Sequence, residues 1–202
     1  MEELLKRYPD LAVCREDIQK AAQLIIDTYK NGGKVLVCGN GGSACDCEHI
    51  VGELMKGFIS NRKVTDERIP ENLRINLQRS LPAISLPSQI GILSAFVNDV
   101  EPDFMYAQLV YGYAKENDLV IGLSTSGNSS NVVNALDVAR CMGVKTVALT
   151  GKKESMLSDI ATVTIKVPES ETYKIQEYHL PVYHYLCMEA EKYFFRFKNY
   201  KQ

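Results

Sequence analysis

The chain holds only three histidines, and two of them have a polar partner at helical spacing. His49 precedes Glu53 by four positions, so on a helix the two side chains share one face and could act together on a metal ion or a substrate. Gln176 precedes His184 by eight positions, about 12 Å of rise on a straight helix, so these two can meet only if their side chains lean together. A solvated surface pair is the alternative interpretation of His49 and Glu53. We interpret the third histidine, His179, as a structural or supporting residue.

A cluster of hydroxyl side chains interrupts the stretch VIGLSTSGNSSNVVNAL (residues 120–136), which begins as an apolar strand and ends as an apolar-periodic helix. The backbone amides from Gly127 onward would lie at the N-terminus of that helix, a position that favours an anion. Together with the hydroxyls of Ser124, Ser126 and Ser129, these amides could surround a phosphate without any Arg or Lys. Simple helix capping by one of the polar side chains is the competing interpretation.

A second loop of this kind, CGNGGSACD (residues 38–46), also joins a predicted strand to a predicted helix. Its glycines allow the backbone to approach a bound anion closely. The letters GNGGSA formally match the G-x-G-x-x-A fingerprint of dinucleotide-binding proteins, which also expects an acidic residue at the end of the second strand. The acids at the required spacing, Asp66 and Glu67, lie instead in a polar segment. We therefore favour phosphate binding over a nicotinamide cofactor.

Five apolar segments of strand length alternate with helical patterns, which indicates a parallel sheet covered on both faces. We predict an α/β fold: a three-layer, doubly wound, parallel five-stranded sheet flanked by helices, with a long N-terminal and a long C-terminal helix, in a single domain over residues 1–202. Ligands of such sheets bind beyond the carboxyl ends of the strands, where both loops lie. The predicted strands cover residues 34–39, 82–86, 119–123, 145–151 and 163–167, and the predicted helices 10–31, 43–58, 88–97, 104–116, 129–142 and 171–197.

One connection departs from this pattern. Residues 60–82 are polar, rich in Arg and Asn, and long for a connection inside a compact domain. We predict a surface excursion or a flap there, with a helical turn around residues 71–78.

The composition excludes several classes of protein. With 46% hydrophobic residues, a chain of 202 residues can bury the core of one good-sized domain. The formal charge of −2 comes from interspersed acids and bases, so we expect no nucleic-acid partner. There is no run of eighteen apolar residues and no secretory signal pattern, so we expect no membrane partner and a cytoplasmic location. The six cysteines form no CxxC pair and are expected to be buried thiols.

Taken together, these residues resemble the sugar isomerase (SIS) domain family, and within it the sedoheptulose 7-phosphate isomerases, also called phosphoheptose isomerases. The similarity runs from about residue 17 to residue 193. STSGNS with a GNGGS loop is typical of the whole superfamily, whereas His49, Glu53, Gln176 and His184 are typical of the isomerase branch. The matching segments are, in order, GGKVLVCGNGGSACDCEH, EL, FVND, GLSTSGNSSNVV, ALTGK and IQEYHLPVYH.

The resemblance implies an aldose-ketose isomerase that converts sedoheptulose 7-phosphate to D-glycero-D-manno-heptose 7-phosphate through an enediol. It implies that Glu53 and His184 are the catalytic pair, and that Zn2+, where present, is bound by His49, Glu53, Gln176 and His184. It also implies a homotetramer with active sites at the subunit interfaces. The residues implied to bind the phosphosugar are Asn40, Gly41, Gly42, Ser43, Asn98, Asp99, Ser124, Thr125, Ser126, Ser129 and Gln176.

Three positions depart from the family pattern. Gln89 stands where the family has an aspartate that touches sugar hydroxyls, and Tyr173 stands where it has an acid. The expected basic residue falls on Gly57, although Lys56 is adjacent. An isomerase of a different phosphosugar is therefore one alternative. The other is a non-catalytic SIS protein that binds phosphosugars or resembles the replication-initiator-associating relatives, which lack the carboxylate and the distal histidine present here.

Overall fold

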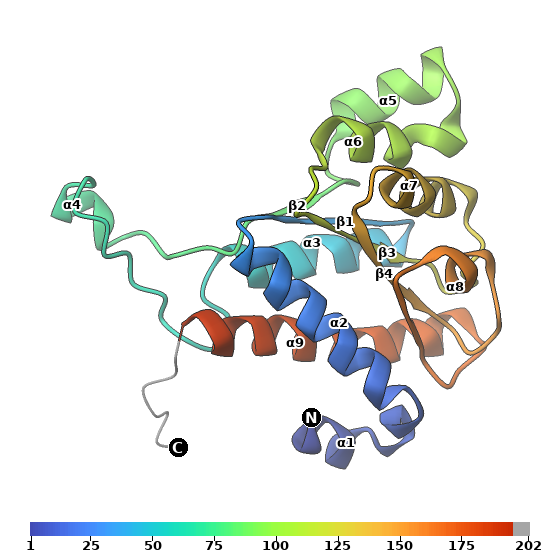
Figure 1. The fold of residues 1–202 in the computed structure, drawn as a ribbon, viewed down its shortest axis with the longest axis horizontal. Coiled ribbons are helices and arrows are strands. Elements are labelled where there is room, and N and C mark those ends of the chain that lie inside the picture. The colour runs from blue at the N-terminus through green and yellow to red at the C-terminus, as the bar shows by residue number, and fades with distance from the viewer. Residues whose placement is uncertain (196–202) are drawn as a thin grey trace.

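The computed structural model describes residues 1–195 and contains a five-stranded sheet in which every paired strand is parallel to its neighbour (Figure 1). The strand order is β2-β1-β3-β4-β5, so the chain starts one strand in from an edge, adds β2 on one side and then winds outward on the other. This is the predicted doubly wound arrangement. The strands are β1 (Val35–Gly39), β2 (Ala83–Ser85), β3 (Leu119–Leu123), β4 (Lys145–Thr150) and β5 (Val163–Lys166).

Helices precede, connect and follow the strands. They are α1 (Glu2–Arg7), α2 (Arg15–Lys30), α3 (Gly42–Met55), α4 (Glu71–Arg74), α5 (Ile90–Asp99), α6 (Met105–Tyr113), α7 (Ser130–Cys141), α8 (Met156–Ile160) and α9 (Thr172–Phe194). Within residues 1–195, none of the helices is both long and apolar enough to cross a membrane.

Some helix predictions differ from the structure. The helix predicted to begin at residue 10 begins as a 3-10 helix, Pro9–Cys14, and becomes the α-helix α2 only at Arg15. The short helices α1 and α8 were not predicted, because such short segments show no apolar period. The predicted end of the last helix, at residue 197, lies outside the described residues.

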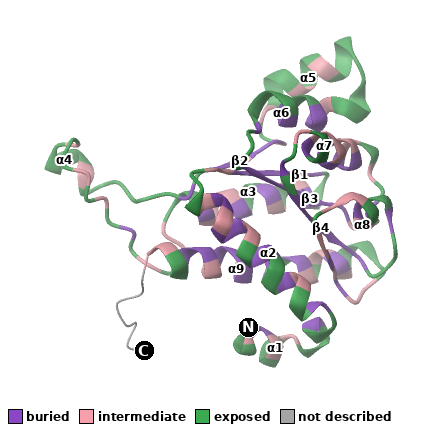
Figure 2. Ribbon diagram, viewed as in Figure 1, coloured by how far each residue is buried: buried purple, intermediate pink, exposed green. Residues whose placement is uncertain are grey.

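The two faces of the sheet are covered by different helices, as the continuously apolar strands predicted (Figure 2). Val35 and Val37 of β1 point into a core that they share with α2, α3 and α9. Leu36 and Cys38, which alternate with them, point into the opposite core, which is shared with α6 and α7. All four side chains are fully buried, so β1 is held rigidly in the middle layer of the fold.

The register of β1 and β3 places the two predicted loops side by side. Gly39, the last residue of β1, is the partner of Leu123, the last residue of β3. The glycine loop after β1 and the hydroxyl loop after β3 therefore leave the same edge of the sheet, and each leads directly into a helix, α3 or α7.

Residues 60–82 form the predicted excursion. Figure 1 shows this segment extending away from the sheet and carrying α4 at its tip, and Figure 2 shows that most of it is exposed. An isolated antiparallel bridge joins Lys63 to Gln78, and Leu81 N donates a hydrogen bond to Leu54 O at the end of α3. Both ends of the excursion are thus fastened near the C-terminus of α3.

Candidate functional site

Three hydroxyls converge in the hydroxyl loop, which runs from Ser124 to Ser129. The Oγ atom of Ser124 lies 2.9 Å from that of Ser129 and 3.5 Å from that of Ser126. Gly127 has a φ of +69°, and a Cβ added there would lie 2.1 Å from Ser155 Oγ. Only glycine fits at this position, so the shape of the loop depends on it.

The two helices that follow the loops begin without a side-chain cap. The N-cap residues are Gly41 for α3 and Ser129 for α7, and neither makes a side-chain capping hydrogen bond. Ser126 Oγ instead accepts from Asn128 N, and Asn128 Oδ1 accepts from Met156 N. The capping interpretation is therefore wrong for α7. At both helix N-termini the backbone amides donate to no capping side chain. Such N-termini are suited to bind an anion.

A reciprocal amide pair joins the two loops. Asn40 Nδ2 donates to Asn131 Oδ1 at 2.8 Å, and Asn131 Nδ2 donates back to Asn40 Oδ1 at 2.9 Å. Ser43, at the start of α3, is buried beneath the glycine loop. The predicted phosphate-binding positions of both loops therefore lie in one region of the molecule.

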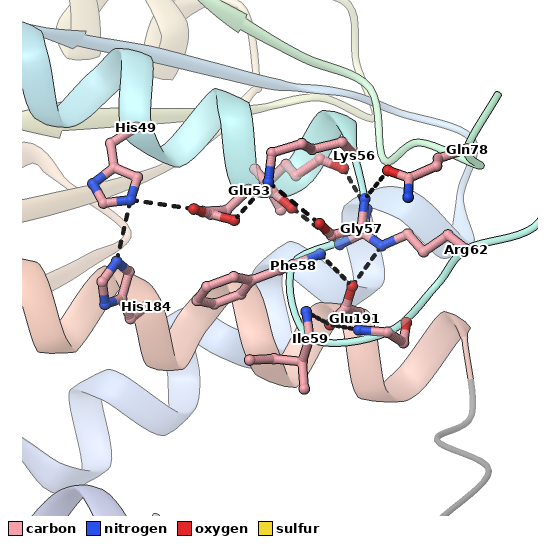
Figure 3. Close-up of polar contacts among 12 residues, drawn as sticks. His49, Glu53, Lys56, Gly57, Phe58, Ile59, Arg62, Gln78, His184 and Glu191 are labelled. Atoms are coloured by element: carbon pink, nitrogen blue, oxygen red, sulfur yellow. Dashed lines mark hydrogen bonds and ion pairs between the residues drawn. The ribbon is translucent and has the colours of Figure 1, made fainter. Parts of the chain in front are cut away.

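The second predicted group lies further along α3, where that helix packs against α9. His49 Nε2 lies 3.2 Å from Glu53 Oε1 and 3.4 Å from His184 Nε2. Figure 3 shows His49 and Glu53 projecting from α3 toward His184 on α9. We call these three residues the imidazole cluster. The structure brings together side chains that are more than 130 positions apart in the sequence.

The carboxylate of Glu53 has one occupied and one unsatisfied oxygen. Oε1 faces His49, whereas Oε2 is buried and makes no hydrogen bond. Lys56 Nζ lies 3.5 Å from Oε2, close enough for charge attraction but without hydrogen-bond geometry. A buried carboxylate oxygen with a free lone pair is suited to accept a proton.

Gln176 lies apart from this cluster. Its amide group contacts the position that a Cβ of Gly42 would occupy, at the N-terminus of α3. His49 is seven residues further along α3, about 10 Å of helix rise away. Within residues 1–195, no three or more His, Cys, Asp or Glu side chains are arranged so that they could hold a metal ion. The predicted set of four zinc ligands is therefore not assembled in this single chain.

A fully buried ion pair lies beside the cluster, toward the end of α3 (Figure 3). Arg62 Nε donates to Glu191 Oε1 at 2.7 Å, and both side chains have no exposed surface. The other guanidinium nitrogens of Arg62 donate to the carbonyl oxygens of Leu54 and Glu53, at the end of α3. Glu191 also accepts from the backbone N–H of Phe58 at 2.8 Å. This pair joins the C-terminus of α3 and the start of the excursion to α9.

Two histidines have pKa values below the ordinary range. Burial, together with the neighbouring His49, lowers the pKa of His184, while the charge of Glu53 opposes this shift. His184 is thereby kept neutral over a wider pH range. His179 is completely buried with its Nε2 3.4 Å from Thr150 O, and this burial lowers its pKa to about 4. The predicted structural role of His179 agrees with this position.

The remaining predicted positions do not join either group. Asn98 and Asp99 lie at the C-terminal end of α5, where Asn98 donates to the Asp99 carboxylate. Gln89, at the start of α5, accepts from Tyr113 Oη. Gly57 N donates to Gln78 Oε1 of the excursion, and Tyr173 is exposed near the start of α9.

Two cavities border the two groups separately. One of about 280 Å³ is lined by Thr125, Ser126 and Lys152, among others, at the hydroxyl loop. The other, about 650 Å³, lies between the N-terminal segment and α9 and is lined by His184 and Phe58. The hydroxyl loop and His184 therefore border different cavities, and His49 and Glu53 line neither of them.

Sequence reasoning missed several residues that hold the site together. Asn131 pairs with the glycine loop, Tyr183 lies between His49 and Asp46, and Arg62 and Glu191 support Glu53. Glu191 follows His184 by seven positions, two helical turns, and that spacing could have placed both residues on one face of α9.

Comparison with known proteins supports the family resemblance. The SIS domain family matches residues 10–151. The phosphoheptose isomerase of Aliarcobacter butzleri is 38% identical over 173 residues, which cover 86% of this chain and 83% of that protein. Two solved structures of phosphoheptose isomerases, each 27% identical, cover 95% of this chain. The one from Francisella tularensis gives a TM-score of 0.76 over 94% of its own chain, and the one from Neisseria gonorrhoeae 0.72 over 98%. The chain therefore belongs to the SIS domain family and, within it, to the phosphoheptose isomerases.

Proposed function

We propose that this protein isomerises sedoheptulose 7-phosphate to D-glycero-D-manno-heptose 7-phosphate, with Glu53 and His184 as the catalytic pair. The observation that carries the proposal is the imidazole cluster, in which the carboxylate of Glu53 and the imidazole of His184 lie against His49. The two helices that carry these side chains are far apart in the sequence but pack together. The substrate is inferred from the relatives named phosphoheptose isomerases, which are similar to this protein over most of the chain.

The two loops would hold the phosphate of the substrate. The hydroxyls of Ser124, Ser126 and Ser129 converge in one loop, and Ser43 and Asn40 lie in the other. The helix dipoles of α3 and α7 add partial positive charge where no side chain caps the helix. Phosphate can therefore be bound mainly by neutral donors. Gly41, Gly42 and Thr125 would contribute backbone and side-chain donors there, and Asn98, Asp99 and Gln176 would contact the sugar.

Glu53 would move the carbon-bound proton. Isomerisation removes a proton from C1 of the ketose and returns it to C2 of the aldose through an enediol. The buried Oε2 atom, which makes no hydrogen bond, would accept this proton. His184, neutral because its pKa is lowered, would exchange the hydroxyl proton between O2 and O1.

We extend the proposal to a zinc ion. His49 Nε2 lies 3.2 Å from Glu53 Oε1 and 3.4 Å from His184 Nε2, and imidazole nitrogens and carboxylate oxygens are donor types that zinc prefers. Because the described residues hold no ready-made metal site, His49, Glu53 and His184 would have to rearrange to hold the metal, and Gln176 would have to move or come from another subunit to join them. Zinc, when bound, would polarise the substrate carbonyl.

The proposal includes a homotetramer in the cytoplasm with active sites at subunit interfaces. Exposed apolar side chains on and near α5 support an interface: Ile90, Ile92, Val97, Val100 and Phe104. The separate cavities at the two groups also suit a site that a second copy completes. The six free thiols are compatible with a reducing compartment, but Cys45 and Cys141 are exposed, so the prediction that all six are buried is wrong for these two. Sedimentation velocity would test the assembly.

The central experiment is turnover of sedoheptulose 7-phosphate by the purified protein, with and without a chelator. The wild-type chain should form heptose 7-phosphate, and Glu53→Gln should lower kcat by about 10²–10⁴-fold because the proton acceptor is lost. A protein that binds the phosphosugar but never converts it would contradict the proposal and favour the binding-protein alternative. Glu48→Gln, an exposed acid on the same helix, serves as the matched control.

A further inference from the structure

The excursion encloses a cavity at the C-terminal end of α3. Its outgoing and returning segments are joined by the Lys63–Gln78 bridge and by Arg79 N, which donates to Arg62 O at 2.6 Å. Gly57 N donates to Gln78 Oε1 at 2.9 Å, which fastens the returning segment to the end of α3 (Figure 3). Residues of both segments and of the end of α3 line a cavity of about 590 Å³. This volume is typical of small-molecule sites, and none of the roles assigned above involves the cavity.

The charged side chains that line this cavity are mostly positive. They are three cations and one acid: Lys56, Lys63, Arg74 and Glu71. Among residues 1–195, neither Lys63 nor Arg74 forms an ion pair. Asp66 is close enough for the charge of Arg74 to lower its pKa, but its carboxylate is held by Arg68. The cavity therefore keeps positive charge that a bound anion would balance.

The uncharged side chains of the lining suit hydroxyl groups. Three amide side chains line the cavity, and within residues 1–195 each has a donor or an acceptor atom that makes no hydrogen bond: Asn61, Asn76 and Gln78. Ile75 and Leu77 add aliphatic surface. In the described part of the chain no aromatic side chain lines the cavity, so no ring is available to stack on a nucleobase. This combination favours a sugar over a nucleotide.

The cavity is separate from the loops that would hold the substrate phosphate. Lys56 follows Ser43 of the glycine loop by thirteen positions, about 20 Å of helix rise along α3. The cavity at the hydroxyl loop shares no lining residue with this one. Lys56 Nζ lies 3.5 Å from Glu53 Oε2, so the cavity adjoins the imidazole cluster on the side away from the loops.

We propose that the excursion and the end of α3 form a second ligand site, which binds a sugar phosphate. Lys63 and Arg74 hold the phosphate, because cations that lack a carboxylate partner can form charge-assisted hydrogen bonds with it. The three amides bind the hydroxyls of the sugar. The site does not depend on the proposed isomerase function, since it uses none of the residues assigned to catalysis or to the phosphate loops.

The direct test is an NMR titration of the wild-type chain, labelled at the Ile δ1 methyl groups, with glucose 6-phosphate as the probe. Ile75 lines the proposed site and Ile175 lines the cavity at the hydroxyl loop, so the two methyl signals report on the two places separately. Ile75→Val and Ile175→Val variants assign the signals. The Ile75 signal should shift and reach saturation. An Ile75 signal that does not move over the titration would overturn the proposal, and this result needs no further variant.

Three other probes test the class of ligand at Ile75. Glucose, which lacks the charge, and inorganic phosphate, which lacks the hydroxyls, should each bind about tenfold or more weakly than glucose 6-phosphate. Equal affinity for either one would contradict a sugar-phosphate site. Adenosine 5′-monophosphate should also bind more weakly, because no ring stacks on its base, and tighter binding would assign the site to nucleotides instead.

A double variant tests the two cations. Lys63→Gln combined with Arg74→Gln should weaken the binding seen at Ile75 about 100-fold, since two hydrogen bonds to a charged group are lost. Lys115→Gln combined with Arg140→Gln is the matched control, because these exposed cations line neither cavity. Unchanged affinity in the first double variant would refute the assignment of the cations.

The outcomes separate this site from the proposed function. If Ile75 responds to glucose 6-phosphate while the wild-type protein converts no heptose phosphate, the proposed function fails and the second site stands. If the protein converts the heptose phosphate and Ile75 never responds, the second site fails and the isomerase stands.

Discussion

The two ends of α3 are built in different ways. At its N-terminus, the glycine loop and the hydroxyl loop obtain their shape from positive φ angles at Gly41 and Gly127 and from contacts between close neighbours such as Ser124 and Ser129. At its other end, the imidazole cluster depends on α9, whose His184 is 135 positions away from His49 in the sequence. The shape of each loop at the first end is therefore set mainly by local sequence, although the Asn40–Asn131 pair joins the two loops across 91 positions, whereas the second end is set by packing.

This difference explains what could be predicted from the sequence. The sheet and its covering helices follow from apolar segments that alternate along the chain, and the loops follow from glycine and hydroxyl spacing. The pairing of His49 with Glu53 also follows from helical spacing, and the structure confirms their contact at 3.2 Å. Contacts within one helix, one strand or one turn can thus be predicted from the sequence.

The supporting residues could not be predicted, because burial is set by the complete fold. Helical spacing could place Glu191 on the same face as His184, but no sequence pattern predicts that Arg62 and Glu191 are both completely buried. The hydroxyl of Tyr183 likewise acquires its two partners only when α3 and α9 pack together. The contact of Gln176 with Gly42 depends on the register of the same two helices.

The largest expected effect on stability lies at the C-terminal end of α3, which packs against α9. Glu191→Gln should leave Arg62 without a partner charge in a buried site and cost about 3–5 kcal/mol in the free energy of unfolding. Glu189→Gln, which breaks a partly exposed pair with Lys192, should cost less than about 1 kcal/mol. Urea denaturation of both variants measures the difference. Equal losses would mean that the packed end does not depend on the buried pair.

The next largest effect on stability concerns His179, which lies on α9 between Gln176 and His184. Its pKa of about 4 in the folded protein is below the ordinary value of 6.5, so the unfolded chain binds the proton more tightly. Its contribution is therefore fully present above about pH 6.5 and is lost as the pH falls toward 4, by about 3 kcal/mol in all.

The check is the unfolding free energy between pH 7 and pH 4 for the wild-type chain and for His179→Gln. The wild-type protein should lose more stability over this interval than the variant does. Parallel curves would show that His179 is not held neutral by burial.

The smallest effect is expected on substrate binding, at the loops near the N-terminal end of α3. Ser126→Ala should raise KM for the phosphosugar about tenfold and leave kcat nearly unchanged, because one hydrogen bond to a charged group is lost. Ser94→Ala, which removes a hydroxyl that donates to Gly91 O within α5, should change neither constant. A fall in kcat without a change in KM would place Ser126 in the chemistry rather than in phosphate binding.

The proposed isomerisation depends above all on the transfer of a carbon-bound proton by Glu53. Incubation of the protein with sedoheptulose 7-phosphate in D2O, followed by NMR of the sugar, measures this transfer directly. The wild-type protein should introduce deuterium at the carbons that exchange protons, whereas Glu53→Gln should bind the sugar and leave it unlabelled. Labelling by Glu53→Gln at the wild-type rate would contradict the account.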